Sequence, residues 1–69
     1  MMKTKYEVGD ILYSSKMKMH MLVEDVLEQC EVGYMGTYLQ YKLLRLQISS
    51  ELLIDVTLLD SDTYTEKVA

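Results

Sequence analysis

Hydrophobic and polar positions alternate over much of this chain in the manner of β-strands. The longest run of strand-forming residues spans 36–48, in the middle of the sequence, and is rich in tyrosine, leucine and isoleucine. Side chains of this kind fit a pleated backbone that is half-buried. A glycine begins the run, and Ser49-Ser50 is the first turn signal after it. We therefore predict that residues 36–48 form the central strand of a small β-domain.

Residues 52–59 show the most regular alternation in the sequence. Apolar residues occupy every second position, and Asp55 and Thr57 lie between them. Successive side chains of a strand point to opposite faces, so this segment predicts a strand with one apolar face. The residues on that face are Leu52, Ile54, Val56 and Leu58.

Shorter signals place the remaining strands and turns. The apolar residues 11–13 predict a first short strand, whereas residues 64–68 fit either a closing strand or a single helical turn. Stretches rich in glycine, serine and aspartate separate the apolar runs, as expected of turns. The predicted turns and loops are residues 9–10, 14–15, 30–37, 49–51 and 60–63.

Residues 16–32 carry two conflicting patterns. One set of apolar positions follows the spacing of an amphipathic helix, which would give a βαββ arrangement of the α+β class. Its members are Met19, Leu22, Val23, Val26, Leu27 and Cys30. Residues 16–21, in contrast, alternate strictly, which is the period of a strand. In a strand, Val23 and Val26 would lie on opposite faces, with a bulge at Glu24-Asp25. Periodicity alone leaves both structures open.

Length and cysteine content limit how this domain is stabilised. Its 69 residues fit a single domain, residues 1–69, with a small core. Domains of this size usually need a disulfide, a metal or a partner subunit. One cysteine excludes an internal disulfide, and one His with one Cys is too few for the four ligands of a structural zinc. We therefore expect tight packing or oligomerisation to stabilise the protein.

Charge and hydropathy limit the ligands and the cellular compartment that we expect for this protein. The net charge of −4 argues against nucleic-acid binding, because Lys and Arg supply most of that affinity by neutralising phosphates. No apolar stretch reaches the ~20 residues of a membrane span, and the start of the chain does not read as a signal peptide. An unpaired cysteine fits a reducing compartment, so we expect a soluble cytoplasmic protein. The nearest approach to a basic patch is Lys3, Lys5, Lys16 and Lys18.

His20, Cys30 and Asp25 are the residues closest to a catalytic set. An activated nucleophile must contact a base, which a carboxylate in turn orients. No nucleophile motif surrounds Cys30. We therefore interpret the cysteine as a packing thiol and the histidine as a structural or surface residue, and we expect no enzymatic activity.

Asp60 and Asp62 occupy the first two acceptor positions of a calcium loop. Thr63 and Tyr64 then stand where such a loop requires further acceptors and a glycine. We interpret the segment as a solvated turn, and we expect neither a metal nor a cofactor.

Residues 6–12, Tyr-Glu-Val-Gly-Asp-Ile-Leu, resemble the opening of SH3-like barrels, including the KOW and Tudor-type variants. In those domains a Gly-Asp turn leads into the first barrel strand. More narrowly, the chain resembles a group of small bacteriophage proteins, especially from phages of marine cyanobacteria. That likeness rests on Leu22–Val26, Tyr41–Leu46, Leu59-Asp60, Tyr64 and Lys67–Ala69.

The resemblance implies an all-β, SH3-like barrel of about five strands, a topology that limits exposed sheet edges. It also favours a strand over a helix for residues 16–32. The core residues expected in such a barrel are Leu43, Ile54, Val56 and Leu58, beside Val8, Ile11 and Val26.

The resemblance implies a binding role and leaves the ligand open, because SH3-like barrels bind peptides, methylated tails, RNA or other virion proteins. We expect a non-enzymatic protein-interaction module, either a phage accessory protein or a virion-associated one, in the host cytoplasm. The alternative is a nucleic-acid-associated KOW or Tudor-like domain. The acidic charge and the single arginine favour the first function. Peptide-binding SH3 domains normally carry a tryptophan, which this chain lacks.

Adjacent leucines predict an apolar patch on the outside of the sheet. The pairs are Leu43-Leu44, Leu52-Leu53 and Leu58-Leu59. Neighbours in a strand point to opposite faces, so one small core takes only one member of each pair. Large exposed patches usually mark interfaces. We therefore expect a homodimer, or docking on a phage or host protein. The residues expected at this interface are Leu44, Leu46, Leu53 and Leu59, with Tyr38 at the rim.

Overall fold

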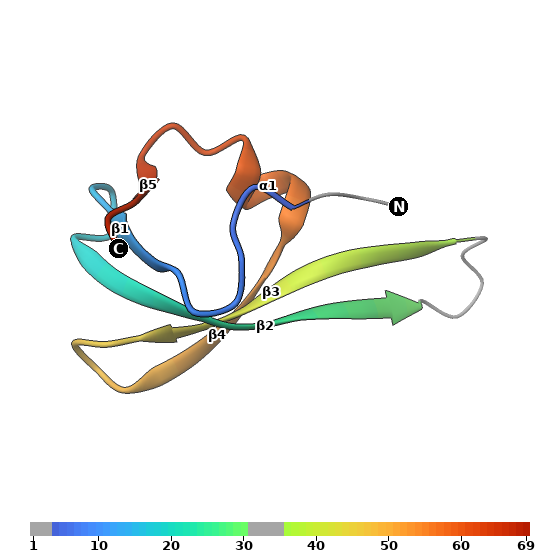
Figure 1. Cartoon of the computed structure of the whole chain (residues 1–69), viewed down its shortest axis with the longest axis horizontal. Helices are drawn as coiled ribbons and strands as arrows, with labels where there is room; N and C mark the ends of the chain where they lie inside the picture. The colour runs from blue at the N-terminus through green and yellow to red at the C-terminus, as the bar shows by residue number, and fades with distance from the viewer. Residues whose placement is uncertain (1–3, 31–35) are drawn as a thin grey trace.

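The computed structural model describes residues 4–30 and 36–69, and they form one antiparallel sheet with one short helix (Figure 1). The order of the five strands in the sheet is β4-β3-β2-β1-β5. The mostly-β prediction is therefore confirmed. The elements are β1 (Ile11–Ser14), β2 (Met19–Cys30), β3 (Thr37–Arg45), β4 (Ser50–Asp55), α1 (Val56–Asp60) and β5 (Thr65–Lys67).

The longest strand, β2, lies in the middle of the sheet and pairs with β1 and β3. The prediction that residues 36–48 form the central strand is wrong in two respects. Strand β3 is one place from the middle, and it ends at Arg45. Residues 46–49 form the turn to β4, where Ser49 has a φ of 51° and the guanidinium Nη2 of Arg45 donates to the Ser50 hydroxyl at 2.8 Å.

Residues 19–30 of the ambiguous segment are a strand, as the resemblance implied, whereas residues 16–18 lie in the turn before it. The bulge expected at Glu24-Asp25 is present between Val23 and Asp25. Its effect differs from the prediction, which placed Val23 and Val26 on opposite faces. Val23 pairs with Leu43, and Val26 pairs with Tyr41 two positions further along the same face of β3. The extra residue of the bulge thus keeps both valines on one side of the sheet. Residues 31–35 of the predicted loop lie outside the described residues.

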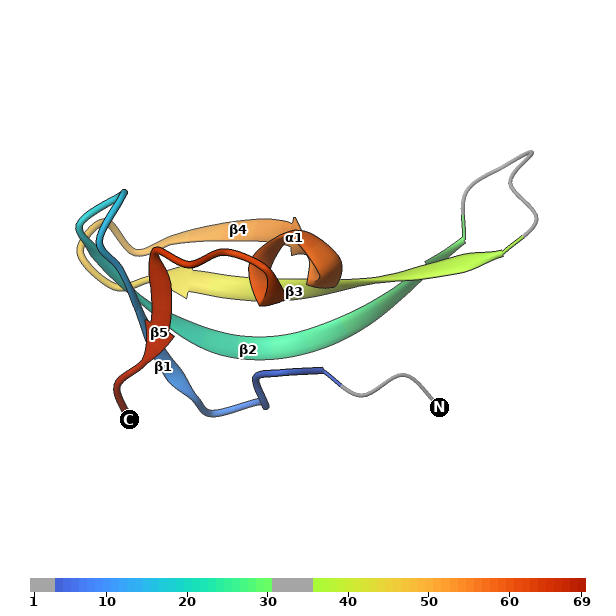
Figure 2. The same cartoon turned by 90° about the horizontal axis from the view of Figure 1, so that it is seen from above.

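The predicted strand 52–59 ends at Asp55, and α1 replaces its second half. Val56 and Leu59 lie three positions apart, so they share one side of the helix, and both are buried. Leu58 points away from them and is 63% exposed, so its predicted place in the core is wrong. Figure 2 shows α1 lying over β3 and β4, the two strands that it contacts.

The core lies between the sheet and the segments that cover one side of it. We call this side, which faces α1, the inner face. The buried apolar residues are Tyr6, Leu12, Met21, Val23, Tyr41, Leu43, Val56 and Leu59, and the half-buried residues packed against them are Val26, Leu39 and Ile54. The predictions for Leu43 and Val56 are confirmed, and Ile54 and Val26 lie at the margin of the core.

Two further predicted core residues lie elsewhere. Val8 is 60% exposed in the turn before β1. Ile11 is half-buried, and it alternates with the fully buried Leu12, so its side chain points away from the core.

A tight turn over residues 7–10 folds the start of the chain against the inner face. The amide of Asp10 donates to the Glu7 carbonyl at 3.0 Å, and the Glu7 amide donates to the Asp10 carboxylate at 2.9 Å. The second bond, with help from the nearby Lys67 ammonium, lowers the pKa of Asp10. Gly9 has a φ of +97°, which other residues rarely adopt. The predicted Gly-Asp turn is thus present.

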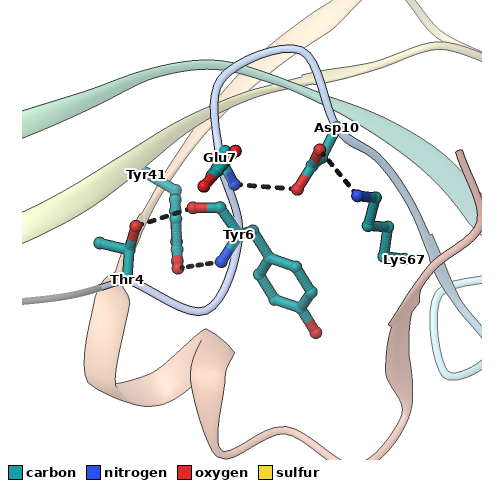
Figure 3. Close-up of polar contacts among 6 residues, drawn as sticks. All are labelled: Thr4, Tyr6, Glu7, Asp10, Tyr41 and Lys67. Atoms are coloured by element: carbon teal, nitrogen blue, oxygen red, sulfur yellow. Dashed lines mark hydrogen bonds and ion pairs between the residues drawn. The ribbon is translucent and has the colours of Figure 1, made fainter.

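A chain of hydrogen bonds then fixes Tyr6 over the sheet, and Figure 3 shows the bond between Tyr6 and Tyr41. The Tyr6 amide donates to the hydroxyl of Tyr41 at 3.2 Å, and that hydroxyl donates to the Asp60 carboxylate at 2.5 Å. The hydroxyl of Tyr6 donates to the Thr65 carbonyl at 3.2 Å. Burial, together with the bond to Asp60, raises the pKa of Tyr41 to about 12. Two tyrosines thus connect the N-terminal segment, β3, α1 and β5.

Of the two structures considered for residues 64–68, the strand is present, over 65–67. Strand β5 pairs with β1 and occupies one edge of the sheet, and β4 occupies the other.

Candidate functional site

The side of the sheet away from α1 carries a second set of apolar side chains. We call it the outer face, and its central residues are Ile11, Leu22, Leu44, Leu53, Asp25 and Lys42. Each of these residues is adjacent in its strand to an inner-face residue, or is the cross-strand partner of a residue that is. Successive side chains of a strand point to opposite faces, so these six side chains point away from α1. Figure 1 shows α1 and the N-terminal segment on the opposite side of β2 and β3.

An apolar row crosses three strands of the outer face. Ile11 of β1 pairs with Leu22 of β2, which pairs with Leu44 of β3. All three side chains are half-buried, because they cover one another along the row. Leu53 of β4 pairs with Lys42 beside this row and is 49% exposed.

Charged side chains lie next to the apolar row. The ammonium of Lys42 lies 3.1 Å from the Glu51 carboxylate. Glu51 also raises the pKa of Glu24, since protonated Glu24 can donate a hydrogen bond to the Glu51 carboxylate, and partial burial acts in the same direction. The Oε1 atom of Glu24 is buried and has no partner among the described residues. Asp25 pairs with Lys42 in the register of β2 and β3.

The structure divides the residues predicted at the interface into three groups. Leu44 and Leu53 lie on the outer face, and Tyr38 is half-buried on the same side of β3. Leu46 is 42% exposed but lies in the turn after β3. Leu59 is 2% exposed within the core, so its place at an interface is wrong. The helix that begins at Val56 is the reason, because it replaces strand alternation by helical spacing.

Sequence reasoning missed four residues of the outer face, and one of them, Asp25, was considered only as part of a catalytic set. Ile11 was expected in the core, and Leu22 and Lys42 were assigned no role. The alternation of Tyr41-Lys42-Leu43-Leu44 contains the signal for Lys42, because it separates the buried positions 41 and 43 from 42 and 44. Leu22 joins the row only through the register with its neighbouring strands, which the sequence does not display.

The catalytic candidates are not brought together. The ring of His20 lies against Tyr13, with ring centroids 4.8 Å apart, and its Nδ1 is 3.1 Å from the Gln47 amide nitrogen. Cys30 is exposed at the other end of β2, roughly 30 Å away along an extended strand. The Asp25 carboxylate accepts a hydrogen bond from the Val26 amide at 2.8 Å.

The two aspartates of the predicted turn bind groups of the protein itself. Asp60 accepts hydrogen bonds from the Tyr41 hydroxyl and the Lys5 amide. Asp62 accepts from the Tyr64 amide and the Thr65 hydroxyl. Within residues 4–30 and 36–69, no three His, Cys, Asp or Glu side chains are grouped to hold a metal ion.

The lysines of the basic patch lie in separate elements. Lys16 and Lys18 are exposed in the β1–β2 turn. The ammonium of Lys5 lies 5.5 Å from the ring centroid of Tyr6, on the segment that covers the inner face. Lys3 lies outside the described residues.

Comparisons with protein-family models, with curated proteins and with solved structures gave no match. In the part of the chain that the structure describes, no helix has both the length and the apolar composition needed to cross a membrane.

Proposed function

We propose that this chain is a non-enzymatic protein-interaction module and that the outer face is its binding surface. The observation that carries the proposal is the apolar row Ile11–Leu22–Leu44 on the side opposite a complete core. A small sheet needs only one apolar side to fold, and contiguous apolar surface on a folded protein usually marks an interface.

The proposal includes an SH3-like barrel and an accessory or virion-associated role in a phage. The turn at residues 7–10 leads directly into β1, as in the opening that the chain resembles. Five antiparallel strands in one sheet, with β5 returning to pair with β1, are consistent with such a barrel. The resemblance to small phage proteins supports the phage role.

A nucleic-acid-binding role has less support. Lys42, at the centre of the outer face, is paired with Glu51 and adjoins Asp25 and Glu24. Affinity for phosphates depends on unpaired cationic side chains. We therefore expect no detectable binding to DNA or RNA at physiological salt, which a titration over a range of salt concentrations would check.

Affinity capture with one surface variant and one matched control tests the proposal. Leu53→Lys places a charge on the outer face, whereas Leu58→Lys places the same charge at a leucine on α1 that is even more exposed. Both variants should fold, as circular dichroism would show. We expect the wild type and Leu58→Lys to capture the same protein from infected-host lysate, with or without nuclease, and Leu53→Lys to capture none. Equal capture by all three proteins would contradict the proposal.

A further inference from the structure

We propose that the outer face binds a basic amphipathic segment of another protein, in which arginine or lysine lies next to leucine-like side chains. This inference rests on the proposed function, because it names the chemistry of the partner that the same surface takes. It follows from two features that lie side by side on the face. One is the apolar row described above, and the other is a group of carboxylates that we call the acidic cluster, Glu24, Asp25 and Glu51.

The acidic cluster surrounds one lysine at the centre of the outer face. Asp25 of β2 is the cross-strand partner of Lys42. Glu51 of β4 pairs with Leu44, and its carboxylate lies 3.1 Å from the Lys42 ammonium. Glu24 is the extra residue of the bulge, and its side chain reaches Glu51, so both lie on this side of the sheet. Three carboxylates thus meet a single ammonium group.

Lys42 does not neutralise the cluster. Its ion pair is made with Glu51, whereas Asp25 is exposed and forms no ion pair with a residue that the structure describes. The Oε1 atom of Glu24 likewise has no partner among the described residues. With all three carboxylates ionised, three negative charges against one positive charge leave two unmatched. The cluster therefore has room for cationic groups that the chain itself does not supply.

The other cationic side chains of the sheet are engaged elsewhere. The guanidinium of Arg45, next in sequence to Leu44 and so directed to the other side of β3, donates to Ser50. The ammonium of Lys67 on β5 lies 3.4 Å from the Asp10 carboxylate. The unmatched charge therefore favours a cationic partner. It disfavours nucleic acid, an anionic lipid surface, and a second copy of this chain, which would bring the same carboxylates.

The apolar row specifies the rest of the partner. Leu44 lies two residues from Lys42 on the same side of β3, which is roughly 7 Å along the strand. A matching segment therefore carries a leucine-like side chain and a cationic one at a similar separation. Positions i and i+2 of a strand, or i and i+4 of a helix, provide it. Arginine suits the contact better than lysine, because its guanidinium can bind two carboxylate oxygens at once.

Arrayed peptides test the inference before the natural partner is known. The first set consists of short peptides in which leucine and arginine are separated by one, two or three alanines. Two matched sets carry glutamate in place of arginine, or serine in place of leucine. We expect the labelled protein to be retained by the leucine–arginine set, and about tenfold less by either matched set, since both kinds of contact are needed. Retention should weaken as the salt concentration rises.

Neutral variants of the protein locate the contact. Glu24→Gln combined with Asp25→Asn removes two charges from the cluster and keeps the acceptor that Asp25 offers to the Val26 amide. The control, Glu7→Gln combined with Glu28→Gln, removes two charges from exposed side chains on the inner side. Fluorescence anisotropy with the best-retained peptide should show binding about tenfold weaker for the cluster variant and unchanged for the control.

Circular dichroism checks that each variant folds, and Asp25→Asn alone tests the same contact if the cluster variant does not. Equal retention of the leucine–arginine and leucine–glutamate sets would overturn the inference, as would equal binding by the cluster variant and the wild type. Serine–arginine peptides retained as strongly as leucine–arginine peptides would overturn it too, and so would binding to a labelled oligonucleotide or to anionic vesicles instead. If Leu53→Lys abolishes capture from lysate but the cluster variant captures the same protein as the wild type, the proposed function stands and only the basic partner is excluded.

Discussion

The two faces of the sheet differ in how their apolar side chains are covered. On the inner face, Tyr6 and α1 close over the strands, and hydrogen bonds through Tyr41 and Asp60 hold them in place. On the outer face, the three side chains of the apolar row remain half-buried and cover one another along the row. Burial on the inner face therefore stabilises the monomer, whereas burial on the outer face becomes complete only when something binds there.

The leucine pair of β3 gives the largest contrast between the faces. Leu43→Ala should destabilise the protein by about 2–5 kcal/mol, because it leaves a cavity in the core, where Leu43 is fully buried. Leu44→Ala, at the next position but on the outer face, should cost less than about 1 kcal/mol in the monomer. Urea unfolding of both variants measures the difference. Equal losses would mean that the two faces are equally covered.

The Tyr41 hydroxyl tests how firmly the cover is attached to the inner face. Tyr41→Phe removes the acceptor of the Tyr6 amide and the donor to Asp60. We expect a loss of about 1–3 kcal/mol in the free energy of unfolding, since a buried amide is left without a partner. Tyr38→Phe, on the outer side of the same strand, is the matched control and should change stability by less than about 0.5 kcal/mol. A harmless Tyr41→Phe would contradict the role given to this hydroxyl.

The turn that brings Tyr6 to the inner face depends on Gly9. An added Cβ at this position would meet no atom within 4 Å, so the cost of Gly9→Ala comes only from its φ of +97°. That cost should be about 1–2 kcal/mol. Val8→Ala changes an exposed side chain in the same turn and should be close to neutral. Thermal unfolding compares the two variants, and similar melting temperatures would show that the turn does not require glycine.

The smallest expected effect concerns Glu24, at the bulge beside the outer face. Its raised pKa means that the folded protein disfavours its ionised form, so ionisation lowers stability above that pKa. The penalty disappears as the pH falls through the raised pKa and below the ordinary value of 4.5. Glu24→Gln should therefore be slightly more stable than the wild type at pH 7, with a difference that shrinks towards pH 4. Urea unfolding of both proteins at a series of pH values checks this. A stability difference that grows in acid would mean that the pKa of Glu24 is lowered in the folded protein.

The strands could be predicted from the sequence where one period runs unbroken. Alternation from 37 to 45 identified β3, and the Gly-Asp turn located β1. In β2 the bulge replaces one two-residue step by a three-residue step between Val23 and Val26. That spacing also occurs in helices, so periodicity could not decide and only the resemblance did.

The helix α1 and the membership of the outer face show where local patterns fail. Residues 52–59 alternate like a strand throughout, but the chain turns into a helix after Asp55 and buries Val56 and Leu59 together. Packing against β3 and β4 overrides the local preference for a strand, and no pattern within residues 52–59 predicts the helix. Leu44 and Leu53 of the candidate site followed from alternation, whereas the row with Ile11 and Leu22 depends on strand order.

The pairing of β5 with β1 has a consequence for the order of folding. The β2–β3 and β3–β4 hairpins join strands that follow one another in the chain, so they close with little loss of chain entropy. Strand β5 instead pairs Lys67 with Leu12, two positions that are 55 residues apart in the sequence. Contacts between such distant positions form slowly. We therefore expect the three hairpin strands to form first and β5 to dock on them last. The amides of this short edge strand should then exchange with solvent before those of β2.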